Sequence, residues 1–315
     1  MTAPLVKPLS DQLPFGARVT GVTAADFSDP SWCREINALF EQRGMIVFEG
    51  MEPSSEMQVA LSNVFGPLKD HPVKIVARVD QSMFPGVIEI ANRPDSGIVE
   101  INGEPLVNWQ PWHFDHSYNN ELNRAGVLRA VTLPPEGGLT GFADGIQIYN
   151  SLSPSIRDKI EGKEIIYTLD LLYANQRFGL PKGFREIRPK GAAILDAAKA
   201  IPRAIHPAVW VRKTGEKVLH VSPYGAAGFH GDETPAGASL FREVWAEIER
   251  VAQPYFHRWN QGDMVIWDNW RMLHQACGVN PKFARVMHRT TIRGDYGLGY
   301  FEDHSSTAKA PLELM

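Results

Sequence analysis

The sequence predicts a mostly β protein with helical additions. Short apolar segments with strand-like patterns recur along the chain, whereas helical periodicity is confined to the N-terminal region and to insertions between strands. This combination is typical of a double-stranded β-helix, a jelly-roll type of sandwich. Periodicity alone does not choose that fold over another α+β arrangement. We expect a single domain spanning 1–315, because barrels and sandwiches with helical additions often reach this length.

Four segments carry helical signals. Residues 32–43 and 238–252 repeat apolar side chains at helical spacing, which predicts amphipathic helices. Two more helices are expected to begin at a serine, one over 54–66 and one over 153–161. The first of these stops at a glycine, and the second has proline in the first helical position.

The expected strands are short and spread along the chain. Their residue types are apolar or alternate between apolar and polar, as in half-buried strands. The segments so predicted are 45–48, 87–91, 112–117, 125–132, 264–267 and 283–295, with a hairpin of 208–212 and 217–221. No internal repeat is visible. Apart from the strand over 87–91, residues 78–110 and 171–205 follow no pattern that assigns a structure.

Composition excludes several classes of protein. The net charge of −4 and the lack of a basic stripe argue against a nucleic-acid binder. No apolar run is long enough to span a membrane, and the first residues lack an apolar signal core. Only two cysteines, Cys33 and Cys277, are present, so we expect no disulfide framework and a cytoplasmic location. We expect a small-molecule partner, and a homo-oligomer is compatible with the sequence.

A candidate metal site is the most informative feature of the chain. His113 and Asp115 are two residues apart, a spacing that in a strand points both side chains to one face. His274 would supply a third ligand from far along the chain. Two histidines and one carboxylate on one side of a metal form the facial triad of non-haem iron(II) oxygenases, which leaves the opposite positions open. The alternative is a surface strand that carries a histidine.

Two arginines follow this candidate ligand. Between Phe283 and Asp295 the sequence alternates as a strand, so Arg285 and Arg289 share one face. Guanidinium groups hold carboxylates in a bidentate geometry, and two of them beside a metal could bind two carboxylates. The alternative is a solvated basic edge strand.

These motifs, taken in order, resemble the taurine dioxygenase and 2,4-dichlorophenoxyacetate dioxygenase family of iron(II)/2-oxoglutarate enzymes. The similarity extends from about Gly16 to about Asp295. The segments that carry it are Phe65–Pro72, Trp112–Asp115, Pro135–Asp144, His206–Gly215 and Trp267–Arg289. The resemblance implies a double-stranded β-helix, and it places 78–110 and 171–205 where such enzymes form lids over a single oxygenase domain.

The resemblance also implies roles for individual residues. His113, Asp115 and His274 would bind Fe(II). Thr140 and Arg285 would bind the co-substrate 2-oxoglutarate, and dioxygen would take the last metal position. Arg289 and His71 would bind a small anionic substrate. Here the chain departs from the named members at Phe114 and Tyr118, and these two residues are candidates from their apolar character alone to line a substrate cavity, with a core role as the alternative.

We therefore expect an iron- and 2-oxoglutarate-dependent dioxygenase that hydroxylates a small anion, with a carboxylate favoured, and releases succinate and CO2. Desaturation or epimerisation by the same cofactors remains an alternative. A zinc hydrolase with the same three ligands is another, but it leaves Arg285 and Thr140 without a role. A non-catalytic binding protein of the jelly-roll type is a third.

Overall fold

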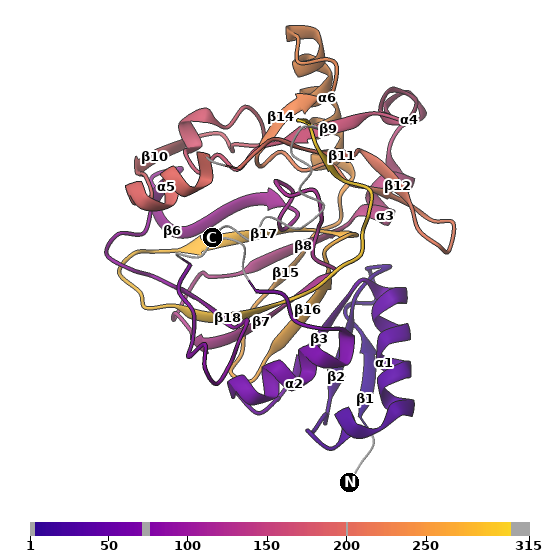
Figure 1. Cartoon of the computed structure of the whole chain (residues 1–315), viewed down its shortest axis with the longest axis vertical. Helices are drawn as coiled ribbons and strands as arrows, with labels where there is room; N and C mark the ends of the chain where they lie inside the picture. The colour runs from indigo at the N-terminus through magenta and orange to yellow at the C-terminus, as the bar shows by residue number, and fades with distance from the viewer. Residues whose placement is uncertain (1–3, 71–75, 200, 304–315) are drawn as a thin grey trace.

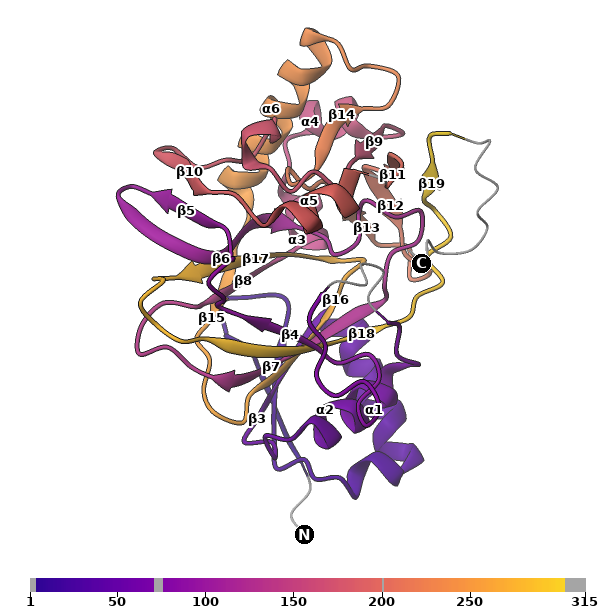
Figure 2. The ribbon, with the colours of Figure 1, turned by 60° about the vertical axis from the view of Figure 1, so that its left-hand side comes forward.

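Two large β-sheets, one above the other, form the middle of the molecule in both views (Figures 1 and 2). The computed structural model describes residues 4–70, 76–199 and 201–303. The seven-stranded sheet has the spatial order β1 (Leu5–Pro8), β2 (Ala17–Thr20), β3 (Met45–Glu49), β16 (Met264–Asp268), β7 (Ala125–Thr132), β18 (Val286–Ile292) and β4 (Ile88–Ala91). The six-stranded sheet has the order β10 (Phe184–Arg188), β5 (Ile98–Ile101), β6 (Glu104–His113), β17 (Met272–Val279), β8 (Thr140–Asp144) and β15 (Tyr255–His257).

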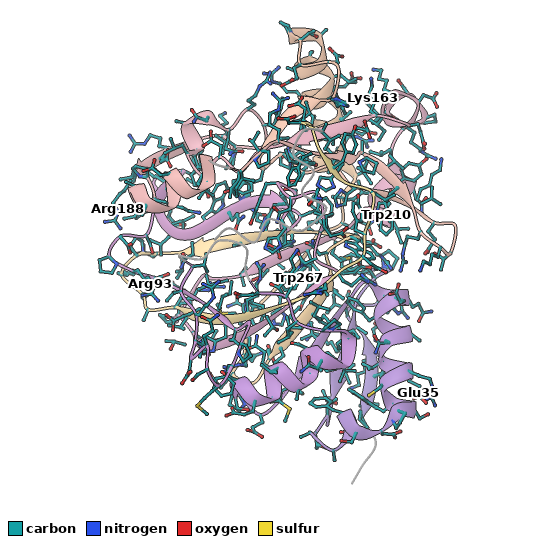
Figure 3. The ribbon with its side chains drawn as sticks, in the orientation of Figure 1. Glu35, Arg93, Lys163, Arg188, Trp210 and Trp267 are labelled. Atoms are coloured by element: carbon teal, nitrogen blue, oxygen red, sulfur yellow. The ribbon has the colours of Figure 1, made fainter. Side chains whose placement is uncertain are left out.

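Apolar side chains from both sheets meet in the layer between them. Leu128 and Trp267 from the seven-stranded sheet belong to the same buried cluster as Phe142 and Met272 from the six-stranded sheet. Figure 3 labels Trp267 near the centre of the molecule. Burial of such large side chains is the main force that holds the two sheets together.

Two N-terminal helices cover the outer face of the seven-stranded sheet, as Figure 1 shows. They are α1 (Pro30–Arg43) and α2 (Ser55–Phe65), and both confirm the sequence prediction. The Ser54 hydroxyl accepts a hydrogen bond from the backbone N–H of Met57 at 3.1 Å, which caps α2. Phe40 and Leu61 pack against Ile46 and its neighbours in the sheet.

A second group of elements lies above the six-stranded sheet in Figure 1. Its four-stranded sheet has the order β14 (Ala226–Phe229), β9 (Glu164–Tyr167), β11 (Ala204–Pro207) and β19 (Tyr300–Phe301). Around it lie the hairpin β12 (Val209–Val211) and β13 (Lys217–Leu219) and the helices α3 (Gly145–Ser151), α4 (Pro154–Ile160) and α6 (Pro235–Val251). The hairpin, α4 and α6 confirm predicted elements. Short 3-10 helices are η1 (Asp26–Ser28) and η2 (Tyr173–Asn175). None of the helices in the described residues is long and apolar enough to cross a membrane.

The two segments without a sequence-based assignment pair with each other. β5 lies in 78–110 and β10 in 171–205, and they form an antiparallel pair that extends the six-stranded sheet. The Arg188 guanidinium donates to the Ser96 carbonyl at 2.8 Å, which adds a contact between the same two segments. α5 (Ala192–Lys199) follows β10. Their pairing depends on partners distant in sequence, which local periodicity does not reveal.

The predicted strand over 112–117 is wrong in its second half. β6 ends at His113, and residues 115–118 form a turn. His116 has a φ of 61°, a left-handed conformation that lies outside the range of regular strands. The Asn119 N–H donates to the His116 carbonyl at 2.9 Å, which closes the turn. The predicted strand over 283–295 is shorter than expected, since β18 begins one residue after Arg285.

Candidate active site

Strand pairing brings the three predicted metal ligands together. His113 ends β6, and His274 lies directly opposite it in β17. Asp115 follows in the turn after β6 rather than in the strand itself. One ligand atom from each of these side chains lies within 4.8 Å of the other two, a group that could hold a metal ion.

All three side chains are almost completely buried. His113, Asp115 and His274 each expose 5–6% of their surface. The Nε2 atoms of His113 and His274 lie 3.8 and 3.6 Å from the two carboxylate oxygens of Asp115. Within the described residues, the Oδ2 atom of Asp115 has no hydrogen-bond partner. A buried acceptor without a partner is costly unless a cation binds it, so this atom fits a metal ion.

Protonation of the site also suits a metal ion. The Nδ1 atom of His113 donates to the Pro111 carbonyl at 2.7 Å, which leaves Nε2 facing Asp115. Burial and the neighbouring His274 lower the pKa of His113 to about 3. Burial raises the pKa of Asp115, but the charge of Arg289 and then the histidines outweigh it and hold this pKa well below its ordinary value. A neutral imidazole and an ionised carboxylate are the forms that bind metals.

An asparagine fixes the backbone of the carboxylate ligand. The Asn269 amide donates to the Asp115 carbonyl at 2.9 Å, and its oxygen accepts from the Asp115 N–H at 2.8 Å. The same amide contacts Asn123, and Asn269 has no exposed surface. The turn that carries Asp115 is thereby held against the end of β16.

A cavity of about 710 Å³ opens beside the two histidines and lies between the two large sheets. Its lining from the six-stranded sheet includes His113, Thr140 and His274. Arg285, directly before β18, and Arg289, within β18, line the same cavity. The two arginines therefore share one face, as their alternation predicts. The predicted co-substrate residues and the metal ligands therefore border one space.

Arg285 is a buried cation without a carboxylate partner in the described part of the chain. It is 5% exposed, and its Nη2 atom donates to the Gly138 carbonyl at 3.4 Å. Burial lowers the pKa of Arg285 to about 10, which still leaves it charged at neutral pH. A Cβ atom at Gly138 would lie 3.0 Å from Arg285 Nε, so the glycine gives the guanidinium its space. Such a group is suited to an anionic ligand.

Thr140 is positioned by a tryptophan that the sequence did not single out. The indole N–H of Trp259 donates to the Thr140 hydroxyl at 3.1 Å, and both residues are buried. This contact uses one lone pair of the hydroxyl oxygen and leaves its proton free to donate into the cavity.

A smaller cavity of about 180 Å³ lies on the Asp115 side. The predicted substrate residues Phe114 and Tyr118 line it, together with Leu169, Leu171 and Tyr224. Phe114 is 2% exposed and stacks on His220 with ring centroids 3.9 Å apart, so most of this side chain belongs to the core. His71 falls outside the described residues.

Arg289 has a partner that the sequence did not indicate. Its Nη1 atom donates to Asp115 Oδ1 at 2.9 Å, and Nη2 donates to the Thr291 hydroxyl at 3.4 Å. Asp268, two residues after Ile266 in β16, accepts from the Trp270 N–H at 2.9 Å and pairs with Arg124. The supporting residues missed by sequence reasoning are Asn269 and Trp259. Only Asn269 lay within a quoted motif.

Comparison with known proteins decides the family. The sequence profile described as "Taurine catabolism dioxygenase TauD, TfdA family" matches residues 5–291. The chain belongs to this family. It is 29% identical to the alpha-ketoglutarate-dependent 2,4-dichlorophenoxyacetate dioxygenase of Cupriavidus pinatubonensis, with 89% of this chain and 95% of that protein covered. It is 28% identical to the (S)-phenoxypropionate/alpha-ketoglutarate-dioxygenase of Sphingobium herbicidovorans, with 89% and 92% covered. The crystal structure of a taurine dioxygenase from Burkholderia xenovorans superposes with a TM-score of 0.68 at 26% identity, covering 93% of this chain and 92% of that one.

Membership makes this TauD/TfdA-family protein an iron(II)- and 2-oxoglutarate-dependent dioxygenase. The buried His-Asp-His group fits the iron, because its unpartnered carboxylate oxygen and neutral imidazole are suitable donors. Arg285, which has no carboxylate partner among the described residues, fits the dicarboxylate co-substrate. Both the zinc hydrolase and the non-catalytic binding protein are disfavoured by this membership.

Proposed function

We propose that this dioxygenase hydroxylates a C–H bond of a small carboxylate and releases succinate and CO2. The observation that carries the proposal is the single cavity lined by His113, His274, Thr140 and Arg285. It offers adjoining places for a metal and a dicarboxylate. In the two relatives named above, the substrates named are carboxylates, 2,4-dichlorophenoxyacetate and phenoxypropionate. This supports the same class of substrate here.

His113, Asp115 and His274 would hold the iron, which supplies the open positions at which dioxygen is activated. Arg285 would bind the far carboxylate of 2-oxoglutarate, and the Thr140 hydroxyl would donate a hydrogen bond to that ligand. Because Thr140 lies in β8 and Arg285 immediately precedes β18, these two groups restrict the co-substrate to one orientation before it reacts. Burial around them excludes water, which strengthens each charged contact.

The substrate would enter on the Asp115 side. The lining of the small cavity combines apolar side chains with charged groups that include Asp115 and Arg289. A carboxylate would bind beside the cationic groups and an apolar body would contact Leu171 and Tyr224. The segments 78–110 and 171–205 would form lids, since Ser96 of the first and Lys190 of the second border the large cavity. A double-stranded β-helix is supported by the two stacked sheets and by the structural match.

Turnover with a matched pair of compounds tests this function. The protein is incubated with Fe(II), ascorbate and 2-oxoglutarate, and succinate is measured for a panel of free acids and their methyl esters. We expect succinate to be formed in a substrate-dependent way, with the acid preferred, and mass spectrometry to show one added oxygen atom. A product that has lost two hydrogens, or that has an inverted centre, would replace hydroxylation by desaturation or epimerisation. Equal turnover of acid and ester would refute the anionic substrate.

A further inference from the structure

Lys190 lies where the two cavities adjoin. It lines the large cavity with Arg285 and Thr140 and the small one with Asp115 and Tyr118. The residues that line both spaces in the described part of the chain are Val76, Gln110, His113, Lys190 and Arg289. The metal ligand His113 and two cations therefore border the same junction. Neither sequence periodicity nor the family resemblance pointed to Lys190.

The Lys190 side chain has no carboxylate within ion-pair distance among the described residues. Burial lowers the pKa of its ammonium group, and the negative charge of Glu186 opposes that effect without forming an ion pair. Glu186 itself accepts from the Tyr173 N–H at 3.4 Å. Other charged groups on the wall of the large cavity include Glu89, Arg93 and Asp95. A half-buried ammonium group without a direct partner favours an anionic ligand.

The stem of Lys190 is held between the two inserted segments. A Cβ atom at Gly97 would lie 3.1 Å from Lys190 Cγ and 3.4 Å from the backbone nitrogen of Lys190. The aliphatic stem of the lysine therefore packs directly over this glycine. Close by, the Arg188 guanidinium is bound to the Ser96 carbonyl. Arg93 and Arg188 are labelled on the same side of the molecule in Figure 3. This packing restricts the directions that the ammonium group can take.

Arg289, the other cation at the junction, already has an anionic partner. Its Nη1 atom is bound to Asp115 Oδ1 at 2.9 Å, and its Nη2 atom contacts Thr291. The charge of Asp115 balances that of Arg289, which weakens the attraction of Arg289 for a second anion. Lys190 has no such partner in the part of the chain that the structure describes, and it is the stronger candidate for a substrate anion.

We propose that Lys190 binds the anionic group of the primary substrate, beside Arg289, and that it sets the preference for anions over neutral analogues. The inference rests on the proposed function, because it names a binding residue for the same site. An anion held at the junction would have its apolar body in the small cavity and a carbon atom close to the metal ligands. The specificity would then depend on a side chain of the segment 171–205 rather than on the sheet that holds the cofactors.

Three variants test the proposal. Lys190→Met keeps an unbranched stem over Gly97 and removes the charge, whereas Lys190→Arg keeps the charge. Lys182→Met is the matched control, because Lys182 is exposed in the same segment and lines neither cavity. The probes are phenoxyacetate, 2,4-dichlorophenoxyacetate and hexanoate, each with its methyl ester. Binding is measured without oxygen, from the change that each probe causes in the visible absorbance of the Fe(II)–2-oxoglutarate complex.

We expect the wild type and Lys182→Met to bind at least one acid tightly and its ester weakly. Lys190→Met should reduce the affinity for that acid roughly tenfold or more, as loss of a partly buried charge pair does, and leave the ester unchanged. Lys190→Arg should retain most of the preference. The absorbance of the complex before a probe is added, and its 2-oxoglutarate dependence, should be equal in all four proteins, because Arg285 and Thr140 are intact.

A second readout requires neither iron nor turnover. Trinitrobenzenesulfonate modifies lysine amines, and peptide mass spectrometry of the metal-free protein reports the modification of Lys190 separately from Lys182. The acid that binds should slow modification of Lys190 and leave Lys182 unaffected. An unchanged acid-to-ester ratio in Lys190→Met would overturn the role of Lys190 while the proposed function stands. If no acid changes the absorbance of the wild-type complex, the proposal of an anionic substrate is refuted, and the role of Lys190 is refuted with it. The binding of 2-oxoglutarate would be unaffected by that result.

Discussion

His274 lies directly opposite His113 in the antiparallel pairing of β17 with β6, and the register of that pairing shifts immediately after His274. The ring centroids of the two histidines are 4.0 Å apart. Cross-strand neighbours of this kind are held in place by the backbone pairing of their strands. Two of the metal ligands are therefore placed by the sheet before any metal binds, and only Asp115 depends on a turn.

Removal of any of the three ligands should abolish turnover without unfolding the protein. We expect His113→Ala, Asp115→Ala and His274→Ala to form no succinate above background, because each loses one donor and the geometry that it fixes. Succinate formation over a range of Fe(II) concentrations measures this, and circular dichroism checks that the fold survives. Near-normal turnover of one variant at saturating iron would remove that residue from the ligand set.

The sequence predicted the helices and several strands because their signals are local. The helices α1 and α2 have apolar residues at helical spacing and a capping Asp or Ser before them, and β7 spans the predicted 125–132. The strands β5 and β10 were not predicted, since each pairs with a segment far along the chain. The strand ending at His113 was extended too far, because the left-handed conformation at His116 has no local signature in a non-glycine residue.

The same distinction applies to the site. The residues with a strong motif, His113, Asp115 and His274, were found by spacing and resemblance, and the structure brings them together. Asn269 supports Asp115 through two hydrogen bonds to its backbone, and Trp259 supports Thr140 through one hydrogen bond. Such supporting contacts depend on three-dimensional packing, so the sequence alone gave no reason to choose them.

Asn269 should matter for iron although it lines neither of the two cavities described for residues 4–70, 76–199 and 201–303. Asn269→Ala removes two hydrogen bonds to the backbone of Asp115 and leaves buried groups without partners. Each such group typically costs about 1–3 kcal/mol. We expect a lower melting temperature and a higher Fe(II) requirement, with an unchanged 2-oxoglutarate requirement once iron is saturating. A variant with normal iron dependence would show that the Asp115 turn holds its position without this side chain.

Arg285 should determine the affinity for 2-oxoglutarate. In Arg285→Ala the far carboxylate would lose its charged partner, and losses of about 2–5 kcal/mol are typical of such buried pairs. The 2-oxoglutarate concentration for half-maximal formation of the visible complex should rise by at least about tenfold, since each 1.4 kcal/mol corresponds to a factor of ten. Arg289→Ala serves as the comparison, and there we expect weaker binding of the carboxylate substrate. The same response in both variants would contradict the separate roles.

Thr140 and Trp259 should be coupled in stability and uncoupled in ligand binding. Thr140→Val leaves the buried indole N–H without an acceptor, at about 1–3 kcal/mol, whereas Trp259→Phe removes the donor as well as some packing. A double-mutant cycle isolates the shared contact. We expect the double variant to be less destabilised than the sum of the single ones. The 2-oxoglutarate affinity should fall in both proteins that lack the Thr140 hydroxyl and stay close to normal in Trp259→Phe. Strict additivity of the unfolding free energies would mean that the hydrogen bond contributes little.

The iron-free protein should lose stability as the pH falls from about 6.5 to about 4. Burial lowers the pKa of His206 to about 4 and that of His220 well below its ordinary value. In the unfolded chain both histidines take up a proton near pH about 6.5, so over this interval the unfolded state binds more protons and the free energy of unfolding falls. Above about pH 6.5 both states hold neutral histidines, and the full stability is present.

His206→Gln tests this cause directly. The Nε2 atom of His206 donates to the Asn119 carbonyl at 2.7 Å, and a glutamine amide can make the same hydrogen bond without titrating. Urea unfolding at about pH 7, 6 and 5 should show that the variant loses less stability on acidification. The pH slope of its free energy of unfolding should be smaller than that of the wild type by at most the contribution of one bound proton. At about pH 7 the variant should be close to the wild type, apart from the change in packing. If both proteins lose the same stability between about pH 6.5 and 5, the acid sensitivity must come from other groups.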